Sequence, residues 1–255
     1  MRMYRELLFA ALGVLPMQLS STVLAAEFQA GQFSEDGFGS LNYRIYAPED
    51  AVVARPLPMV VFLHGAGQRG GDNDSQLVHG ARAIRAFIES HNQPAVIIAP
   101  QVPEGEQWVN TPWGDARHTM PTEPSRTMRL LIGLIRATIA QGGVDRDRVY
   151  ITGLSMGGFG TWDAVARAPE LFAAAIPICG GGDTARVEDF ASVPIWAFHG
   201  DADQVVMVSR SRDMIDALIT TGAKPRYTEY VGVEHDSWTQ TYDDEVMQWL
   251  FAQSR

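Results

Sequence analysis

The chain contains 255 residues, of which 46% are hydrophobic and 20% charged, and its formal net charge is −10. This composition excludes a disordered or collagen-like chain, because the apolar content is ordinary and Gly and Pro follow no period. The acidic balance argues against a nucleic-acid binder, whose affinity comes mainly from Lys and Arg on phosphates. The length fits one large domain or two small ones.

The N-terminal segment differs in character from the rest of the chain. Arginines precede an apolar run at residues 7–15, and small residues follow as far as Ala26. A charged region, an apolar region and a small-residue cleavage site are typical of a secretory signal peptide. The apolar run is too short to span a bilayer. We therefore expect a signal peptide at 1–26, a mature domain at 27–255 with no membrane span, and a secreted or periplasmic location.

Apolar patterning predicts strands and helices that alternate along the chain. Short β-branched runs suit strands buried on both faces of a parallel sheet, and apolar residues at three- and four-residue spacing suit helices. In chain order these patterns predict strands at 41–46, 58–63 and 95–99, an irregular segment at 102–124, a helix at 125–139, a strand at 148–152, a helix at 159–168, strands at 173–178 and 193–198, a helix at 208–219, a strand at 226–231 and a helix at 243–251.

This alternation is typical of a single α/β domain whose central sheet is mostly parallel and flanked by helices. No linker rich in Gly, Pro or Ser divides the chain. The strands at 41–46 and 226–231 alternate between apolar and polar positions, which predicts outer positions in the sheet. The segment at 102–124 holds four Pro and two Trp with little periodicity. Long irregular segments of compact domains tend to be functional loops.

A Gly-x-Ser-x-Gly pattern lies between the strand at 148–152 and the helix after it. It reads Gly153-Leu154-Ser155-Met156-Gly157. Glycine at both flanks permits a tight strand-to-helix turn that holds the serine in a strained conformation. Such a turn places Ser155 Oγ at the carboxyl end of the sheet and aims the Met156 N–H at the position where an oxyanion would form. Ser155 is the predicted nucleophile.

A nucleophilic serine needs a base and an acid that orients the base. In this arrangement the chain order is serine, acid, histidine. Asp201 and Asp203 both follow the strand at 193–198; the spacing favours Asp203 and leaves Asp201 open, with a turn role as its alternative. Among the six histidines, only His235 falls after both the serine and the acid. His235 is the predicted base.

The second oxyanion donor is expected in the loop after the strand at 58–63. This loop reads His64-Gly65-Ala66-Gly67. Glycine at position 65 permits close approach of the backbone, and the Ala66 N–H is the best-placed donor, with Gly67 as the alternative.

Four motifs occur together in one order. They are Leu-His-Gly-Ala-Gly at 63–67, Gly-Leu-Ser-Met-Gly-Gly at 153–158, His-Gly-Asp-Ala-Asp at 199–203 and His-Asp-Ser-Trp at 235–238. With them the chain resembles the α/β-hydrolase superfamily over nearly all of its mature length. More narrowly it resembles secreted, cap-less esterases grouped with feruloyl and acetylxylan esterases, polyhydroxybutyrate depolymerases and predicted peptidases. The resemblance implies Ser155 as nucleophile, Asp203 as acid, His235 as base, and Ala66 and Met156 as the oxyanion hole.

The short distance along the chain between Ser155 and Asp203 leaves no room for a cap domain. The roof of the pocket must then come from loops, chiefly 102–124. We expect Trp108 and Trp113, with Trp238 beside the base, to contact substrate, and core packing is the alternative for each tryptophan.

These features predict a serine esterase that cleaves small-molecule or polymer-linked carboxylic esters through an acyl-enzyme. No cofactor is expected, and no metal-binding motif occurs in the sequence. Cys179 is the only cysteine and is expected to be a buried residue at a strand end. A serine peptidase or a polyester depolymerase would use the same triad, and a non-catalytic binding module that kept the fold is a third hypothesis.

Overall fold

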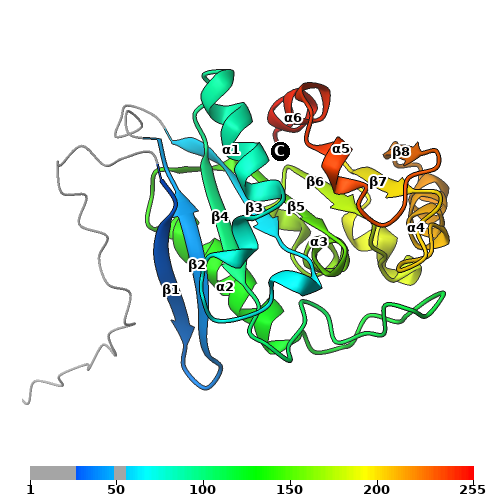
Figure 1. Cartoon of the computed structure of the whole chain (residues 1–255), viewed down its shortest axis with the longest axis horizontal. Coiled ribbons are helices and arrows are strands. Elements are labelled where there is room, and N and C mark those ends of the chain that lie inside the picture. Colours follow the sequence, from blue (N-terminus) through cyan, green and yellow to red (C-terminus); the bar gives the residue numbers. More distant parts are fainter. Residues whose placement is uncertain (1–26, 49–55) are drawn as a thin grey trace, which may run out of the picture.

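The computed structural model describes residues 27–48 and 56–255. The predicted signal peptide at 1–26 lies outside the described residues. Eight strands form one sheet in the order β1-β2-β4-β3-β5-β6-β7-β8 (Figure 1). The strands are β1 (Gln29–Glu35), β2 (Gly39–Tyr46), β3 (Leu57–Leu63), β4 (Val96–Gln101), β5 (Val144–Leu154), β6 (Ala174–Ile178), β7 (Trp196–Gly200) and β8 (Arg226–Tyr230).

The sheet is mostly parallel, as predicted. Strands β1, β2 and β4 pair antiparallel, and every pair from β4 through β3 to β8 is parallel. The β8 strand lies at one edge, as its alternating pattern predicts. The β2 strand does not lie at the other edge, because the unpredicted strand β1 pairs along its outer side. The alternation of β1 is hard to recognise, since its residues are mostly polar and Phe33 is its only large apolar side chain.

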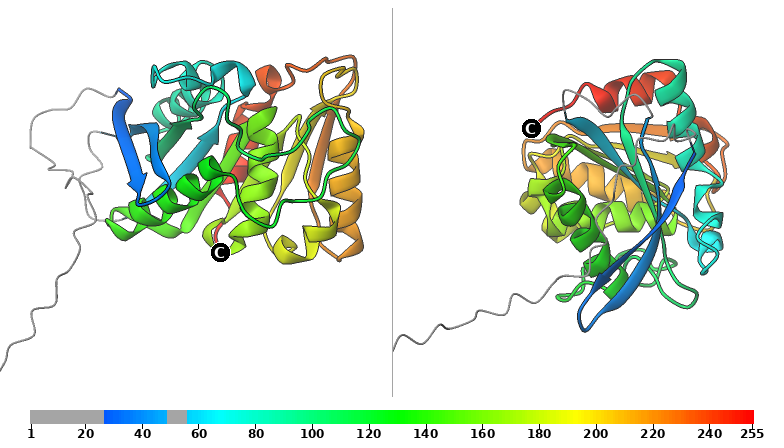
Figure 2. Two further views of the ribbon diagram at one scale, coloured as in Figure 1. Left: turned by 90° about the horizontal axis from the view of Figure 1, so that it is seen from below. Right: turned by 90° about the vertical axis from the view of Figure 1, so that its left-hand side faces the viewer.

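Helices cover both faces of the sheet (Figures 1 and 2). Helices α1 and α6 lie on one face, and α2, α3 and α4 lie on the other. Successive residues of β3 point to opposite faces, so Val61 and Leu63 enter one core while Val60 and Phe62 enter the other. The helices are α1 (Gly80–Ser90), α2 (Arg126–Ala140), α3 (Met156–Arg167), α4 (Ser209–Thr220), α5 (Trp238–Thr241) and α6 (Asp244–Phe251).

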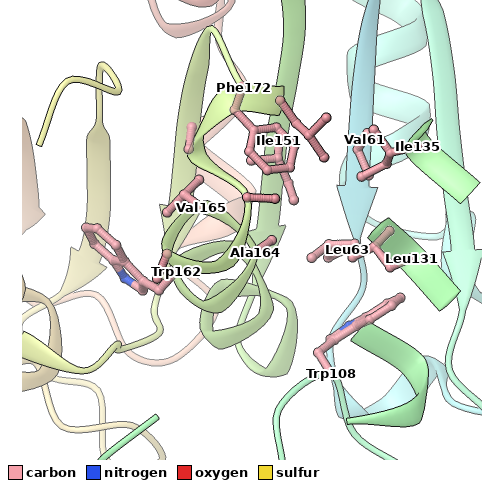
Figure 3. Packing of buried hydrophobic residues seen from close by; sticks show 14 of the residues in the cluster. Val61, Leu63, Trp108, Leu131, Ile135, Ile151, Trp162, Ala164, Val165 and Phe172 are labelled. Atoms are coloured by element: carbon pink, nitrogen blue, oxygen red, sulfur yellow. The ribbon is translucent and has the colours of Figure 1, made fainter. Parts of the chain in front are cut away.

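The larger core lies between the sheet and helices α2 and α3 (Figure 3). Leu131 and Ile135 of α2 pack toward β3, while Trp162 and Val165 lie on α3. Ile151 at the centre of β5 is completely buried. Complete burial of one such side chain stabilises the fold by about 1.5–3 kcal/mol, so the many buried side chains of this core stabilise the sheet.

The segment between β4 and α2 contains no helix or strand, as predicted. Figure 2 (left) shows this segment in green, running across α3 toward α4. Hydrogen bonds hold the C-terminal part of this segment in place. The Met120 N–H donates to Asp183 Oδ2 at 2.8 Å, and Arg167 donates to the Pro121 carbonyl at 2.6 Å. Among the described residues, no helix has the length and hydropathy needed to cross a membrane.

Candidate active site

Ser155 lies in the turn between β5 and α3, with φ 55° and ψ −119°. A positive φ is unfavourable for a residue with a Cβ and costs about 1–3 kcal/mol. The Ser155 N–H donates to the Ile178 carbonyl at 3.0 Å and lies 3.2 Å from Cys179 Sγ. These contacts with the last residue of strand β6 and the residue after it hold the strained backbone in place. The turn has the sharp geometry that the Gly-x-Ser-x-Gly pattern predicts.

Glycines after the serine let α3 lie directly against the ends of the strands. A Cβ on Gly157 would lie 2.0 Å from the Leu63 carbonyl oxygen, and one on Gly158 would lie 2.2 Å from the Ile178 carbonyl oxygen. Both distances are too short for any side chain, and both obstacles are backbone atoms. The first turn of α3 therefore packs on the ends of β3 and β6, which brings the loops after these strands next to Ser155.

Ser155, His235 and Asp203 form one hydrogen-bonded chain. Ser155 Oγ lies 2.9 Å from His235 Nε2, and His235 Nδ1 lies 2.7 Å from Asp203 Oδ2. The carboxylate accepts a hydrogen bond from the Nδ1–H, so in the neutral ring Nε2 is unprotonated and accepts from the serine hydroxyl. Three separate loops at the carboxyl edge of the sheet, after β5, β7 and β8, supply these side chains. The structure thus brings together the three residues that the sequence nominated.

The Asp203 carboxylate is completely buried and satisfied on both oxygens. Oδ1 accepts from the Val205 and Val206 N–H groups at 2.8 and 2.9 Å. Burial by itself would raise the pKa of Asp203, but hydrogen bonds from His199, His235 and the backbone outweigh burial and hold the pKa well below its ordinary value. The Asp203 carboxylate is therefore ionised at neutral pH.

Asp201, the competing candidate for the acid, has a different role. Its Oδ1 accepts from the Gly232 N–H at 2.6 Å, which ties the loop after β7 to the loop after β8. The latter loop carries His235. Asp203 contacts the histidine directly, whereas Asp201 stabilises the loop that leads to it.

The two predicted oxyanion donors each begin a helical turn. Met156 is the first residue of α3 and Ala66 is the first residue of the 3-10 turn Ala66–Gln68. An N–H group at such a position has no carbonyl of its own helix to bind. A Cβ on Gly65 would lie 2.9 Å from Leu154 Cδ1, so the turn at Ala66 packs beside the residue that precedes the nucleophile. Gly67 is exposed, with nothing within 4 Å of the position of its absent Cβ.

His64, at the end of β3, is a buried brace for these loops. Its Nδ1–H donates to the Gly65 carbonyl at 2.6 Å, and its Nε2 accepts from the Val102 N–H at 2.9 Å. Burial lowers the pKa of His64 to about 4, so the ring is neutral at physiological pH. The neutral tautomer joins the loop after β3 to the loop after β4.

Trp108 does not occupy the position expected of a substrate contact. Its side chain is completely buried, its Nε1–H donates to the His64 carbonyl at 3.1 Å, and a Cβ on Gly160 would lie 2.8 Å from Trp108 Cβ. The expectation that Trp108 contacts substrate is wrong, because the completely buried ring anchors the start of the 102–124 segment in the core (Figure 3).

Trp113 and Trp238 are half-buried. The Arg69 guanidinium lies 5.9 Å from the centroid of the Trp113 ring. Trp238 lies 5.4 Å from the His235 ring at an interplanar angle of 89°, and its other neighbour is the His79 ring at 5.5 Å. Trp238 therefore packs edge-to-face on the catalytic candidate His235, a contact that its place three residues along the chain suggests but does not specify.

The middle of the 102–124 segment contacts α4 and α3. Arg210, which is buried, donates to His118 Nδ1, and its guanidinium lies 5.1 Å from the Phe159 ring. Burial and the charge of Arg210 together lower the pKa of His118 to about 4. The neutral His118 ring thus accepts a hydrogen bond that holds this segment over the loop after β6.

Three groups that often bind metals lie near one another: ligand atoms of Cys179, Asp203 and His235 all lie within 4.8 Å. Their chemistry does not suit a metal ion. Both nitrogens of His235 are already engaged, one with Asp203 and one with Ser155. Cys179 is completely buried, and burial raises the pKa of its thiol far above the ordinary value, so the thiolate that binds metal is strongly disfavoured.

Comparison with known proteins places this geometry in a family. A solved structure of a thermostable esterase superposes with a TM-score of 0.83 at 42% identity, over 89% of this chain and 63% of that one. An uncharacterized secreted protein of Arthroderma benhamiae is 27% identical over 70% of this chain and 21% of its own length. Poly(3-hydroxyalkanoate) depolymerase C of Paucimonas lemoignei is 27% identical over 69% of this chain and 39% of its own length.

The chain spans less than two thirds of the length of each of these relatives. The family model described as phospholipase/carboxylesterase matches residues 48–248, which include all three side chains of the hydrogen-bonded chain. Two structural features agree with this family match. They are the eight-stranded sheet with helices on both faces and the turn that holds Ser155 at a positive φ. The described residues form one α/β-hydrolase domain, and the chain belongs to the phospholipase/carboxylesterase family.

Proposed function

We propose that the protein is a serine hydrolase that cleaves carboxylic esters through an acyl-enzyme. The observation that carries this proposal is the hydrogen-bonded chain from Ser155 Oγ through His235 to Asp203, with distances of 2.9 and 2.7 Å. A serine hydroxyl, a base within reach of its proton and a buried acid behind the base are the groups that a serine hydrolase uses for acyl transfer.

In the first step, Ser155 Oγ attacks the ester carbonyl while His235 Nε2 takes the hydroxyl proton. Asp203 keeps the proton on Nδ1 and stabilises the imidazolium that forms. The Ala66 and Met156 N–H groups donate to the carbonyl oxygen as it becomes an oxyanion, because both are free of helical partners at the start of their turns. His235 then gives its proton to the departing alkoxide, and the acyl group stays on Ser155.

In the second step, water attacks the acyl carbon. His235 takes a proton from the water, the same two N–H groups stabilise the second oxyanion, and the proton returns to Ser155 Oγ as the carboxylic acid leaves. The residues of this chain thus supply every proton transfer of the cycle.

We propose small-molecule or polymer-linked esters, including feruloyl-type esters, as the substrates. The half-buried Trp113 ring offers a flat apolar face of the kind that suits an aromatic acyl group or a sugar. Similarity to a thermostable esterase and to a poly(3-hydroxyalkanoate) depolymerase supports ester chemistry in preference to peptide cleavage. We also propose that the protein is secreted, on the pattern of residues 1–26 and the similarity to a protein named as secreted.

The proposal is tested with Ser155→Ala and a panel of p-nitrophenyl esters, methyl ferulate, acetylated xylan, polyhydroxybutyrate and a peptide nitroanilide. Ester turnover by the parent and a loss of at least about 10³-fold in kcat for the variant are expected. A fluorophosphonate probe should label the parent and not the variant. Preferential cleavage of the nitroanilide would make the protein a peptidase, and a parent that is neither labelled nor active would make it a binding module.

A further inference from the structure

The catalytic carboxylate is shared between two histidines. Besides His235 Nδ1 at 2.7 Å, Asp203 Oδ2 has His199 Nε2 at 3.2 Å. The His199 side chain and the carboxylate are both completely buried. Since Oδ1 is occupied by two backbone N–H groups, the second histidine contacts the very oxygen that orients the base.

The position of the His199 proton follows from its neighbours. Nε2 lies 3.0 Å from the Val206 carbonyl and 3.2 Å from Asp203 Oδ2, and both are acceptors. Nε2 must therefore carry a proton in either charge state of the ring. Nδ1 lies 2.8 Å from Ser211 Oγ, which lies 3.2 Å from the Gly180 carbonyl. The Ser211 hydroxyl satisfies Nδ1 as a donor to the neutral ring or as an acceptor from the charged one.

The chain of contacts returns to the nucleophile. Gly180 follows Cys179, whose Sγ lies 3.2 Å from the Ser155 backbone nitrogen. A Cβ on Gly180 would lie 2.5 Å from the Gly158 carbonyl carbon, so this glycine packs against the first turn of α3. His199 and Ser211 therefore link the back of the acid to the backbone beside Ser155 through a path that does not pass through His235.

Two charged side chains near this path, Glu229 and Arg210, have partners of their own. Glu229 lies opposite His199 in the β7–β8 register and binds Arg212 at 2.6 Å. Arg210, next to Ser211 on α4, donates to His118 instead. Within the described residues, Asp203 is thus the acidic group in direct contact with His199.

We propose that His199 is a positioning residue for the triad: its Nε2–H fixes Asp203 Oδ2 in the direction of His235 and neutralises part of the carboxylate charge that His235 meets. This inference rests on the proposed esterase function and adds to it a second histidine and a supporting serine, Ser211. Loss of the Nε2–H would leave more negative charge facing the His235 imidazolium, which stabilises the protonated base.

The test compares His199→Leu, which removes the donor, with His199→Gln, whose amide nitrogen can take the place of Nε2. The pH dependence of kcat/KM on p-nitrophenyl acetate is measured for both. In the Leu variant, kcat is expected to fall about 10-fold and the acidic limb to move to higher pH by about 0.5–1 unit. The Gln variant should return the acidic limb to that of the parent. An acidic limb that stays at its parental pH in the Leu variant, or moves equally in both variants, overturns the inference.

The Ser211→Ala variant and a proton NMR measurement test the same role of His199 if the His199→Leu variant does not fold or shows no turnover. Ser211→Ala keeps His199 but removes the partner of Nδ1, and it should move the acidic limb in the same direction by a smaller amount, even if the Leu variant does not fold. The low-field proton resonance of the His235 Nδ1–H should shift in His199→Leu and not in His199→Gln. This resonance needs no turnover, so it decides the role of His199 separately from the esterase proposal; an unshifted resonance in His199→Leu contradicts that role.

Discussion

The Trp238 ring stands perpendicular to the His235 ring, with an interplanar angle of 89° and centroids 5.4 Å apart. The indole packs against the imidazole and so restricts its rotation. The two residues are only three apart in the chain, and α5 begins at Trp238. Helix α5 therefore positions the Trp238 ring, and the loop that precedes α5 positions His235.

Trp238→Ala should lower kcat more than it raises KM. Removal of the ring leaves His235 free to rotate out of hydrogen-bond distance, and misplacement of a reacting group by about 1 Å can cost about 10²-fold. We expect kcat on p-nitrophenyl acetate to fall by about 10- to 100-fold. The Trp238→Phe variant should recover part of this kcat, because it keeps an aromatic ring beside His235. Trp249→Ala is the matched control, because that ring packs on Trp196 and should reduce stability alone. A rise in KM with kcat unchanged would instead make Trp238 a substrate contact.

The two aspartates after β7 should respond differently to the same substitution. Asp203→Asn puts an amide against His235 Nδ1, favours the wrong tautomer and should lower kcat by about 10⁴-fold. Asp201→Asn weakens only the hydrogen bond from the Gly232 N–H, so kcat should stay within about twofold while the free energy of unfolding falls by about 1 kcal/mol. Steady-state kinetics and urea unfolding measure the pair, and the opposite ranking of kcat would exchange the two roles.

Gly157→Ala should destabilise the fold and abolish turnover. Its Cβ would lie 2.0 Å from the Leu63 carbonyl oxygen, a backbone atom that moves only with β3. We expect a loss of at least about 2 kcal/mol in the free energy of unfolding. Gly71→Ala makes the same chemical change where no atom lies within 4 Å, and it should leave both stability and activity close to the parent. Equal stability of the two variants would contradict the packing of α3 on β3.

Stability should fall as the pH decreases from about 6.5 to about 4, because the folded protein holds both His64 and His118 at a lowered pKa; His64 is the more buried of the two. Burial lowers the pKa of His64 from 6.5 in the unfolded chain to about 4 in the folded protein. Between these values the unfolded chain binds the proton and the folded protein does not, so acid favours unfolding. A shift of this size corresponds to about 3 kcal/mol.

Urea unfolding at several pH values between 4 and 7.5, about one unit apart, measures this dependence. His64→Gln removes the titrating ring but retains an oxygen that can accept from the Val102 N–H, so its stability should vary less over the same range. A dependence as steep in the variant as in the parent would assign the proton uptake to other groups.

Much of the fold follows from local pattern. The apolar runs of the parallel strands appear in the sheet within a few residues of their predicted bounds, since strands buried on both faces must be continuously apolar. The β7 strand begins at Trp196, later than predicted, because Pro194 has no N–H for the ladder. The apolar pattern does not predict the edge strand β1. An exposed strand does not need apolar residues, so β1 is defined only by its pairing with β2.

The sequence by itself determined which residues are proposed as the reacting groups and their order, because the turn at Ser155 depends on adjacent glycines and Asp203 and His235 follow particular strands. Only the tertiary structure decided which neighbours these groups meet. Trp108 is buried under Gly160, Asp201 binds Gly232, and His199 reaches Asp203. Such contacts depend on how a side chain is directed once distant segments have packed, and chain order carries no information about that direction.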